Sequence, residues 1–194
     1  MPSIKLRSVG LAAAVAACSL AFVGCTTTRP NDQASGTSSR TSIDAQVNAS
    51  LSKLYDTVPG SRELVAKSRG VLVFPSVVGA SLGIGAEYGR GALRVNGATQ
   101  GYYSTTAGSI GFQAGAQSKA VIYLFTTQDA LDKFRNSSGW TVGADATVAV
   151  ANVGANGSVD TNTVQQPVVG FVMTNVGLEA GVSLQGAKIS RIQL

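Results

Sequence analysis

The chain has 194 residues and a formal net charge of +5, and it contains no histidine. The missing histidine removes the usual general base at neutral pH and the commonest metal ligand, which argues against an enzyme. The mild positive excess is not gathered into long basic runs, so it argues against nucleic-acid binding and fits weak attraction to an anionic surface.

The N-terminal residues are typical of a secretory signal peptide. Lys5 and Arg7 form a short basic region, and an alanine-rich apolar run covers residues 9–21. This run is shorter than the about 20 residues that cross a bilayer. We therefore expect residues 1–24 to be a cleaved lipoprotein signal peptide.

Cys25 is the predicted lipidation site, because Phe22-Val23-Gly24-Cys25 resembles the bacterial lipobox. Two alternatives stay open: a lipobox that ends at Cys18 after a shorter apolar run, and an ordinary secreted protein with a free Cys25. Residues 25–41 are then the lipidated cysteine and a polar, flexible tether. We expect a lipid-anchored protein of the bacterial cell envelope, and Thr26 after the cysteine favours the outer membrane by analogy with enterobacterial sorting.

Residues 42–194 are long enough for a single domain with its own core, and they begin with two predicted helices. Apolar residues at helical spacing run from Ile43 to Leu54, after a possible capping box of Thr41 and Asp44. Pro59-Gly60 ends this helix. Ser61 caps a shorter helix, "RELVAKS", which Gly70 closes.

The remaining residues predict short strands and one further helix. Asn96-Gly97 is a strong hairpin signal, and Thr126 with Asp129 forms a capping box before the helix "QDALDKFRN". The predicted strands are "GVLVF", "ALRVNGATQGYYSTT" as a pair, "SIGFQAGAQ", "KAVIYLF", "ATVAVANV" before a turn at Asn156-Gly157, and two or three within "VVGFVMTNVGLEAGVSLQGAKISRI". This order predicts an α+β fold: N-terminal helices packed on a glycine-rich, strongly curved, mainly antiparallel β-sheet.

The glycine-rich stretch "GASLGIGAEYGRG", residues 79–91, does not have the spacing of a nucleotide-binding loop. Its glycines at 83, 85 and 89 give G-x-G-x-x-x-G, one residue longer than the dinucleotide-binding fingerprint, and no helix pattern follows. All five glycines have odd numbers, whereas the even positions from 80 to 88 are apolar, so as a strand it has one nearly bare face. Either another element packs closely on that face or a ligand or lipid chain lies on it.

The sequence contains no clear catalytic or metal-binding motif. The acidic residues are sparse and have no metal-ligand spacing. Glu87 and Glu179 face each other only if the sheet brings them together, and surface carboxylates are the simpler interpretation. We expect no catalytic residue, no cofactor, no metal site and no small-molecule substrate.

Four segments in order resemble the SYLF domain family: "KSRGVLVFPSVVGASLGIGAEYGRGAL", "YYSTTAGSIGFQAGAQSKAVIYLF", "ALDKFRNSSGWTVGADATVAV" and "GLEAGVSLQGAKI". The resemblance implies a non-catalytic phospholipid-binding module, with phosphoinositides as the eukaryotic ligand. Gly79 and Val176 stand where the family often has lysine. The resemblance therefore implies general affinity for anionic lipid more than phosphoinositide selectivity.

The predicted lipid contacts are the basic residues near the second helix and the first hairpin: Arg62, Lys67, Arg69, Arg90 and Arg94. The expected partner is a phospholipid membrane surface, with an envelope protein as a further possible partner and no nucleic acid. The alternative function is a structural or interaction protein of the bacterial envelope with no lipid ligand beyond its own anchor.

Overall fold

The computed structural model describes residues 32–152, 159, 163, 165–179 and 181–194, with the side-chain surroundings of 32–35, 80–84 and 109–117 left aside. The chain divides into Met1–Pro30, which lies outside the described residues, and a compact unit, Asn31–Leu194. All described helices and strands and both hydrophobic cores belong to this second unit. Residues Asn31–Leu194 therefore have their own hydrophobic core, as an independently folding domain requires.

Three helices flank the sheet: α1 (Asp32–Thr57), α2 (Ser61–Lys67) and α3 (Gln128–Asn136). The helix predicted at residues 128–136 is confirmed, but its cap is Thr127, whose side chain accepts a hydrogen bond from the Ala130 backbone at 3.3 Å. The hydroxyl of Thr126 instead donates to the Gln166 carbonyl at 2.7 Å.

Helix α1 begins at Asp32, so part of the predicted flexible tether, residues 32–41, is helical. Thr41 lies inside the helix and its hydroxyl donates to the Thr37 carbonyl at 3.0 Å, which rules out the predicted cap. The extension has a tertiary cause: Arg40 donates to the Leu194 carbonyl, and the Leu194 backbone packs against Gly36. Such contacts override the weak helical propensity of this serine- and threonine-rich segment.

The sheet is built on one long ribbon of two antiparallel strands, β1 (Gly70–Val95) and β2 (Ala98–Phe125). Several predicted short strands are therefore continuous. The predicted hairpin is confirmed: Asn96 and Gly97 have φ values of 51° and 80°, as a two-residue type I′ turn requires.

Five shorter strands complete the sheet in the order β3-β7-β2-β5-β4, with β1 on β2 and β6 on β5. They are β3 (Trp140–Thr141), β4 (Ala149–Val150), β5 (Val168–Thr174), β6 (Gly177–Leu178) and β7 (Lys188–Ile192). Among the described strands only β4 and β5 pair in parallel, so the α+β fold with a strongly curved, mainly antiparallel sheet is confirmed. The predicted turn at Asn156-Gly157 lies outside the described residues.

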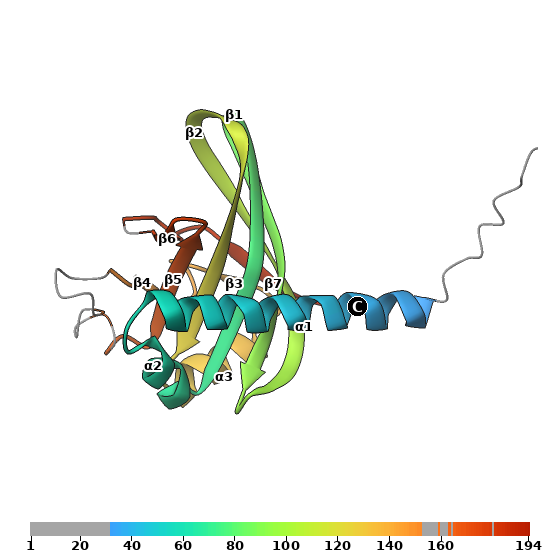
Figure 1. The fold of residues 1–194 in the computed structure, drawn as a ribbon, viewed down its shortest axis with the longest axis vertical. Helices are drawn as coiled ribbons and strands as arrows, with labels where there is room; N and C mark the ends of the chain where they lie inside the picture. Colours follow the sequence, from blue (N-terminus) through green and yellow to red (C-terminus); the bar gives the residue numbers. More distant parts are fainter. Residues whose placement is uncertain (1–31, 153–158, 160–162, 164, 180) are drawn as a thin grey trace, which may run out of the picture. The chain divides into compact units, whose positions relative to one another are not determined.

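The ribbon folds back on itself, so that the first and last parts of β1 come together (Figure 1). A β-carbon at Gly91 would clash with the Val73 carbonyl oxygen and lie 2.8 Å from Cδ1 of Phe74. A β-carbon at Gly89 would lie 2.8 Å from the Ser76 carbonyl oxygen. At these two glycines the predicted bare face is packed, and the element packed on it is the same strand.

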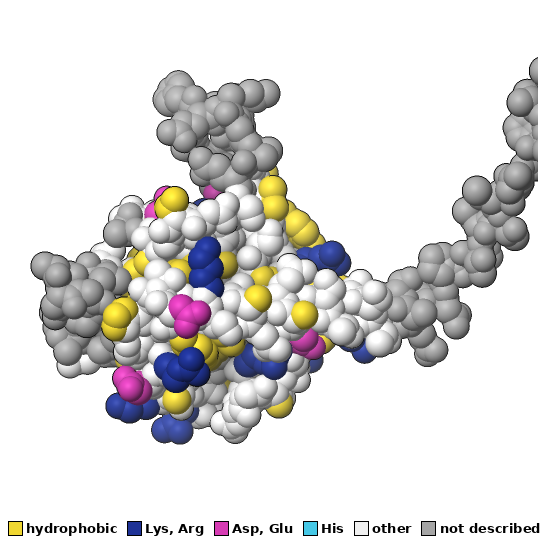
Figure 2. Space-filling view, viewed as in Figure 1, with side chains coloured by type: hydrophobic (Ala, Val, Ile, Leu, Met, Phe, Trp, Pro, Cys, Tyr) yellow, Lys and Arg dark blue, Asp and Glu magenta, His cyan; other side chains and the backbone are white. Residues whose placement is uncertain are grey.

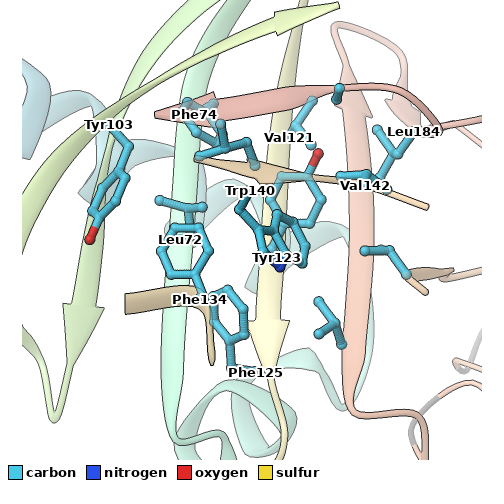
Figure 3. Close-up of a cluster of buried hydrophobic side chains, with 14 of the residues drawn as sticks. Leu72, Phe74, Tyr103, Val121, Tyr123, Phe125, Phe134, Trp140, Val142 and Leu184 are labelled. Carbon is cyan, nitrogen blue, oxygen red and sulfur yellow. The ribbon is translucent and has the colours of Figure 1, made fainter. Parts of the chain in front are cut away.

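Both faces of the sheet are buried where the strands are most apolar, because successive side chains point to opposite sides. Inner-face residues such as Leu72 and Tyr123 join an aromatic cluster around Trp140, to which α3 contributes Phe134 (Figure 3). Outer-face residues such as Val73 and Ile122 pack against the apolar side of α1. The double burial explains the continuous apolar runs in the sequence.

We predict that Gly91→Ala destabilises the compact unit by about 1–3 kcal/mol, because the added methyl group must displace backbone of the same strand. Gly108→Ala is the matched control, since no atom lies within 4 Å of a β-carbon at that position. Chemical denaturation of both variants measures the difference. Equal stability of the two variants would show that the close approach at Gly91 is not needed.

Candidate functional site

A groove of about 660 Å³ lies between the N-terminal half of α1 and the outer face of β1. Helix α1 is held there by Ile43 and Val47, which are buried against the sheet. A register shift between Phe74 and Val77 interrupts β1 beside the helix. The groove is lined by Ser38, Ser39, Ser42, Ile43, Gln46, Pro75, Ser76, Val78, Tyr88, Gly89 and Arg90.

The polar part of the groove combines four serines with one basic side chain, Arg90. The Ser42 hydroxyl accepts from Gln46 at 3.1 Å, and Ser76 shares a hydrogen bond of 3.0 Å with Ser118. Arg90 is exposed, and its side chain makes no hydrogen bond or ion pair with any residue that the structure describes. Its guanidinium group is therefore available to an anion.

Two exposed hydrophobic side chains adjoin this polar part. Val78 is 48% exposed and Tyr88 is 51% exposed, although both lie on strand β1. Figure 2 shows hydrophobic side chains next to a basic one near the place where the ribbon passes α1. The groove thus offers hydroxyl and guanidinium donors beside an apolar surface.

Arg94, another predicted lipid contact, is engaged within the fold. Its Nη2 lies 3.4 Å from Asp44 Oδ1 and donates to Asn48 Oδ1 at 3.1 Å. Asp44 also accepts from Thr99 and Tyr102, each at 2.9 Å. Burial, then the hydrogen bond to Asp44 and its charge, raises the pKa of Tyr102, which keeps its hydroxyl a donor. Arg94 therefore holds α1 on the hairpin.

The other three predicted contacts, Arg62, Lys67 and Arg69, are exposed at α2 and its exit, and none of them lines the groove. The Arg62 guanidinium lies over the Tyr55 ring, 4.3 Å from its centroid. Of the five predicted residues, Arg90 lines this groove, and the structure does not bring the α2 group into it.

A second cavity, of about 390 Å³, lies on the inner side of the ribbon and contains an ion pair that sequence reasoning missed. Lys119 Nζ lies 3.0 Å from Glu87 Oε1. Glu87 and Glu179 do not form the carboxylate pair that the sequence left as the less favoured interpretation, because Glu87 pairs with Lys119 and Glu179 follows β6 and is exposed. The sequence did contain a sign that Lys119 points inward. Lys119 is an odd-numbered residue of the same strand as Val121 and Tyr123, whose side chains lie on the apolar inner face.

Among the described residues, no group of acidic or cysteine side chains is placed to hold a metal ion. The same part of the chain contains no helix with the length and apolar character needed to cross a membrane.

The comparison with known families identifies the C-terminal part of the chain. Residues 106–193 match the family model described as "Ysc84: Las17-binding protein actin regulator". Residues 106–193 are thus similar to the Ysc84 (SYLF) domain family, in agreement with the resemblance seen in the sequence. A search of curated proteins found no match. The match covers part of β2 and all later elements, whereas α1 and the glycine-rich part of β1 precede it.

We predict that Asp44→Ala destabilises the unit by about 1–3 kcal/mol, because it leaves Arg94, Thr99 and Tyr102 without their common acceptor. Asp56→Ala is the matched control on the same helix, since Asp56 is exposed and its side chain forms no hydrogen bond with a described residue. Thermal unfolding compares the two variants. A loss no larger than that of Asp56→Ala would mean that this network does not hold α1.

Proposed function

We propose that this domain binds anionic phospholipid at the groove between α1 and β1, without catalysis, in a protein anchored to the bacterial cell envelope through Cys25. The observation that carries the proposal is the unpaired guanidinium of Arg90 beside four serines and two exposed hydrophobic side chains. The family resemblance, which implies a phospholipid-binding module, supports the same function.

The chemistry of the groove fits a lipid phosphate. A guanidinium group presents planar, always charged donors that match phosphate oxygens. Serine hydroxyls add donors that rotate to suit an acceptor. Tyr88 and Val78 lie next to these donors, and an aromatic ring with a polar hydroxyl suits the boundary between headgroups and acyl chains.

Arg62, Lys67 and Arg69 contribute in a different way under this proposal. They are exposed and lie outside the groove, so they attract the domain to an anionic surface without selecting a headgroup. Each such charge near an anionic membrane is worth about 1 kcal/mol, and salt screens it within about 10 Å at 0.1 M.

The test is flotation of the compact unit Asn31–Leu194 with vesicles of phosphatidylcholine, alone or mixed with phosphatidylglycerol. A shorter unit starting at Ser42 is unsuitable, because it lacks Ser38 and Ser39 of the groove. We expect binding to the mixed vesicles only, and binding should weaken as salt is raised.

Arg90→Gln should weaken binding to the mixed vesicles about tenfold or more, because it removes one charge near the membrane, worth about fivefold, and also the direct hydrogen bonds to the phosphate. Arg62→Gln is the matched control, because it removes the same charge from a residue outside the groove. It should reduce binding less than Arg90→Gln, and this difference should persist at higher salt.

Two outcomes would contradict the proposal. Equal effects of Arg90→Gln and Arg62→Gln would mean that the groove does not select lipid. A wild-type unit that ignores mixed vesicles even at low salt would favour an interaction protein, in line with the protein partner that the family description names.

The proposed anchor has its own test in the full chain. Cys25→Ala should block lipid attachment and signal cleavage, whereas Cys18→Ala should leave both intact. Partitioning into a detergent phase and the mass of the mature chain measure these changes. The opposite result for the two variants would move the anchor to Cys18.

A further inference from the structure

The inner cavity of about 390 Å³ is separate from the proposed lipid groove. Residues of β1 and β2 line one side of it, and residues 182–187 line the other. The two sites lie on opposite faces of the same strand, because neighbouring side chains point to opposite sides. Val77 and Glu87 point inward, whereas Val78 and Tyr88 point outward. Its volume lies at the lower end of the range for cavities that hold small organic ligands.

The Tyr123 hydroxyl faces this cavity without a partner. The Tyr123 side chain is 1% exposed, and its ring meets Trp140 edge-on with centroids 6.0 Å apart. Figure 3 shows its hydroxyl pointing toward Val121 and Leu184, two other residues of the cavity wall. No described residue forms a hydrogen bond with that hydroxyl.

Burial, with the charge of Glu87 adding to it, raises the pKa of Tyr123. The hydroxyl therefore stays protonated and can donate a hydrogen bond. Thr105, which is 5% exposed and lines the same cavity, likewise forms no side-chain hydrogen bond with a described residue. Among the described side chains only Arg94 Nε is fully buried without a partner, so both hydroxyls are accessible from the cavity. Two such hydroxyls on one wall can bind a polar group.

The ion pair fixes the charge that the cavity accepts. Glu87 and Lys119 lie on the same wall, and their side chains are only 21% and 19% exposed. Their opposite charges cancel, so the wall offers a dipole with little net charge. A ligand with a net charge would lose its hydration without gaining an opposite unpaired charge.

The rest of the wall is apolar. Its side chains are those of Val77, Ala107, Val121, Val182, Leu184 and Ala187. Such a surface favours a hydrocarbon tail next to the polar groups, since burying apolar surface is favourable at about 25 cal/mol per Å².

We propose that this cavity binds a small amphiphile without net charge. Its polar head bonds to the hydroxyls of Tyr123 and Thr105 and to the Glu87–Lys119 pair, and its tail packs on Val121 and Leu184. A neutral head and a zwitterionic head share this chemistry. The proposal adds a ligand to the domain and does not depend on the groove.

Three octyl compounds with different heads test the charge argument on the unit Asn31–Leu194. They are monooctanoylglycerol (neutral), octylphosphocholine (zwitterionic) and octanoate (anionic), each used below its micelle concentration. Calorimetry gives affinity and stoichiometry, and the emission of Trp140, the chain's single tryptophan, reports on the neighbourhood of Tyr123.

We expect one molecule of the neutral or the zwitterionic compound to bind and to change the Trp140 emission, and the stronger of the two identifies the head. Octanoate should bind about tenfold more weakly or not at all. If neither monooctanoylglycerol nor octylphosphocholine binds, the proposal is wrong. Equal or stronger binding of octanoate would overturn the charge argument on which it rests.

Variants locate the site. Tyr123→Phe should lower the affinity roughly threefold to tenfold, the loss of one hydrogen bond, while the melting temperature stays equal or rises. Tyr103→Phe is the matched control, because Tyr103 is buried in the same core but does not line the cavity. A melting temperature that falls for Tyr123→Phe with unchanged affinity would assign the hydroxyl a structural role only.

Ala107→Leu should abolish binding by filling the cavity, and its melting curve shows whether it folds. Arg90→Gln should bind the octyl compounds like the wild type, which separates this result from any outcome with vesicles. If Tyr123→Phe and a folded Ala107→Leu variant both bind like the wild type, the amphiphile lies elsewhere and the proposal is wrong.

Discussion

The close approach of Gly91 to the backbone of Val73 shapes the rest of this domain. Two parts of one strand can come this near only where a side chain is missing. Their contact folds the long β1–β2 ribbon and encloses its inner face. The same fold assigns Glu87 to the inner cavity and Arg90 to the outer groove, although they are three residues apart. Both candidate sites therefore depend on a contact that involves no functional group.

Helix α1 depends on this arrangement and completes it. Its apolar side covers the outer face of the sheet, and Asp44 ties it to the hairpin through Arg94, Thr99 and Tyr102. Toward its N-terminus the helix continues to Asp32, and Arg40 in this part donates to the Leu194 carbonyl. Ser38 there forms part of the groove wall. A segment that resembles a tether in composition thus contributes polar groups to the candidate site.

The sequence predicted correctly those features that neighbouring residues in the chain determine. Asn96-Gly97 specified the turn, and the parity of the glycines identified the face that is closely packed. Features that depend on contacts between residues far apart in the chain could not be predicted from local patterns. The start of α1 depends on Leu194, far along the chain, and the partner of Glu87 is Lys119 on the neighbouring strand. For the same reason the sequence did not distinguish Arg90 from Arg94 among its five candidate contacts, whereas the fold pairs Arg94 with Asp44 and leaves the Arg90 side chain unpaired among the described residues.

Strand β1 is also a long edge of the sheet, because among the described strands it pairs only with β2. A free edge of this length is a template on which another chain can add a strand and aggregate. Here the edge is interrupted by register shifts, by Pro75, and by the return of Gly91 over the Val73 carbonyl. The glycines that fold the ribbon thereby also shield the backbone groups that would seed aggregation.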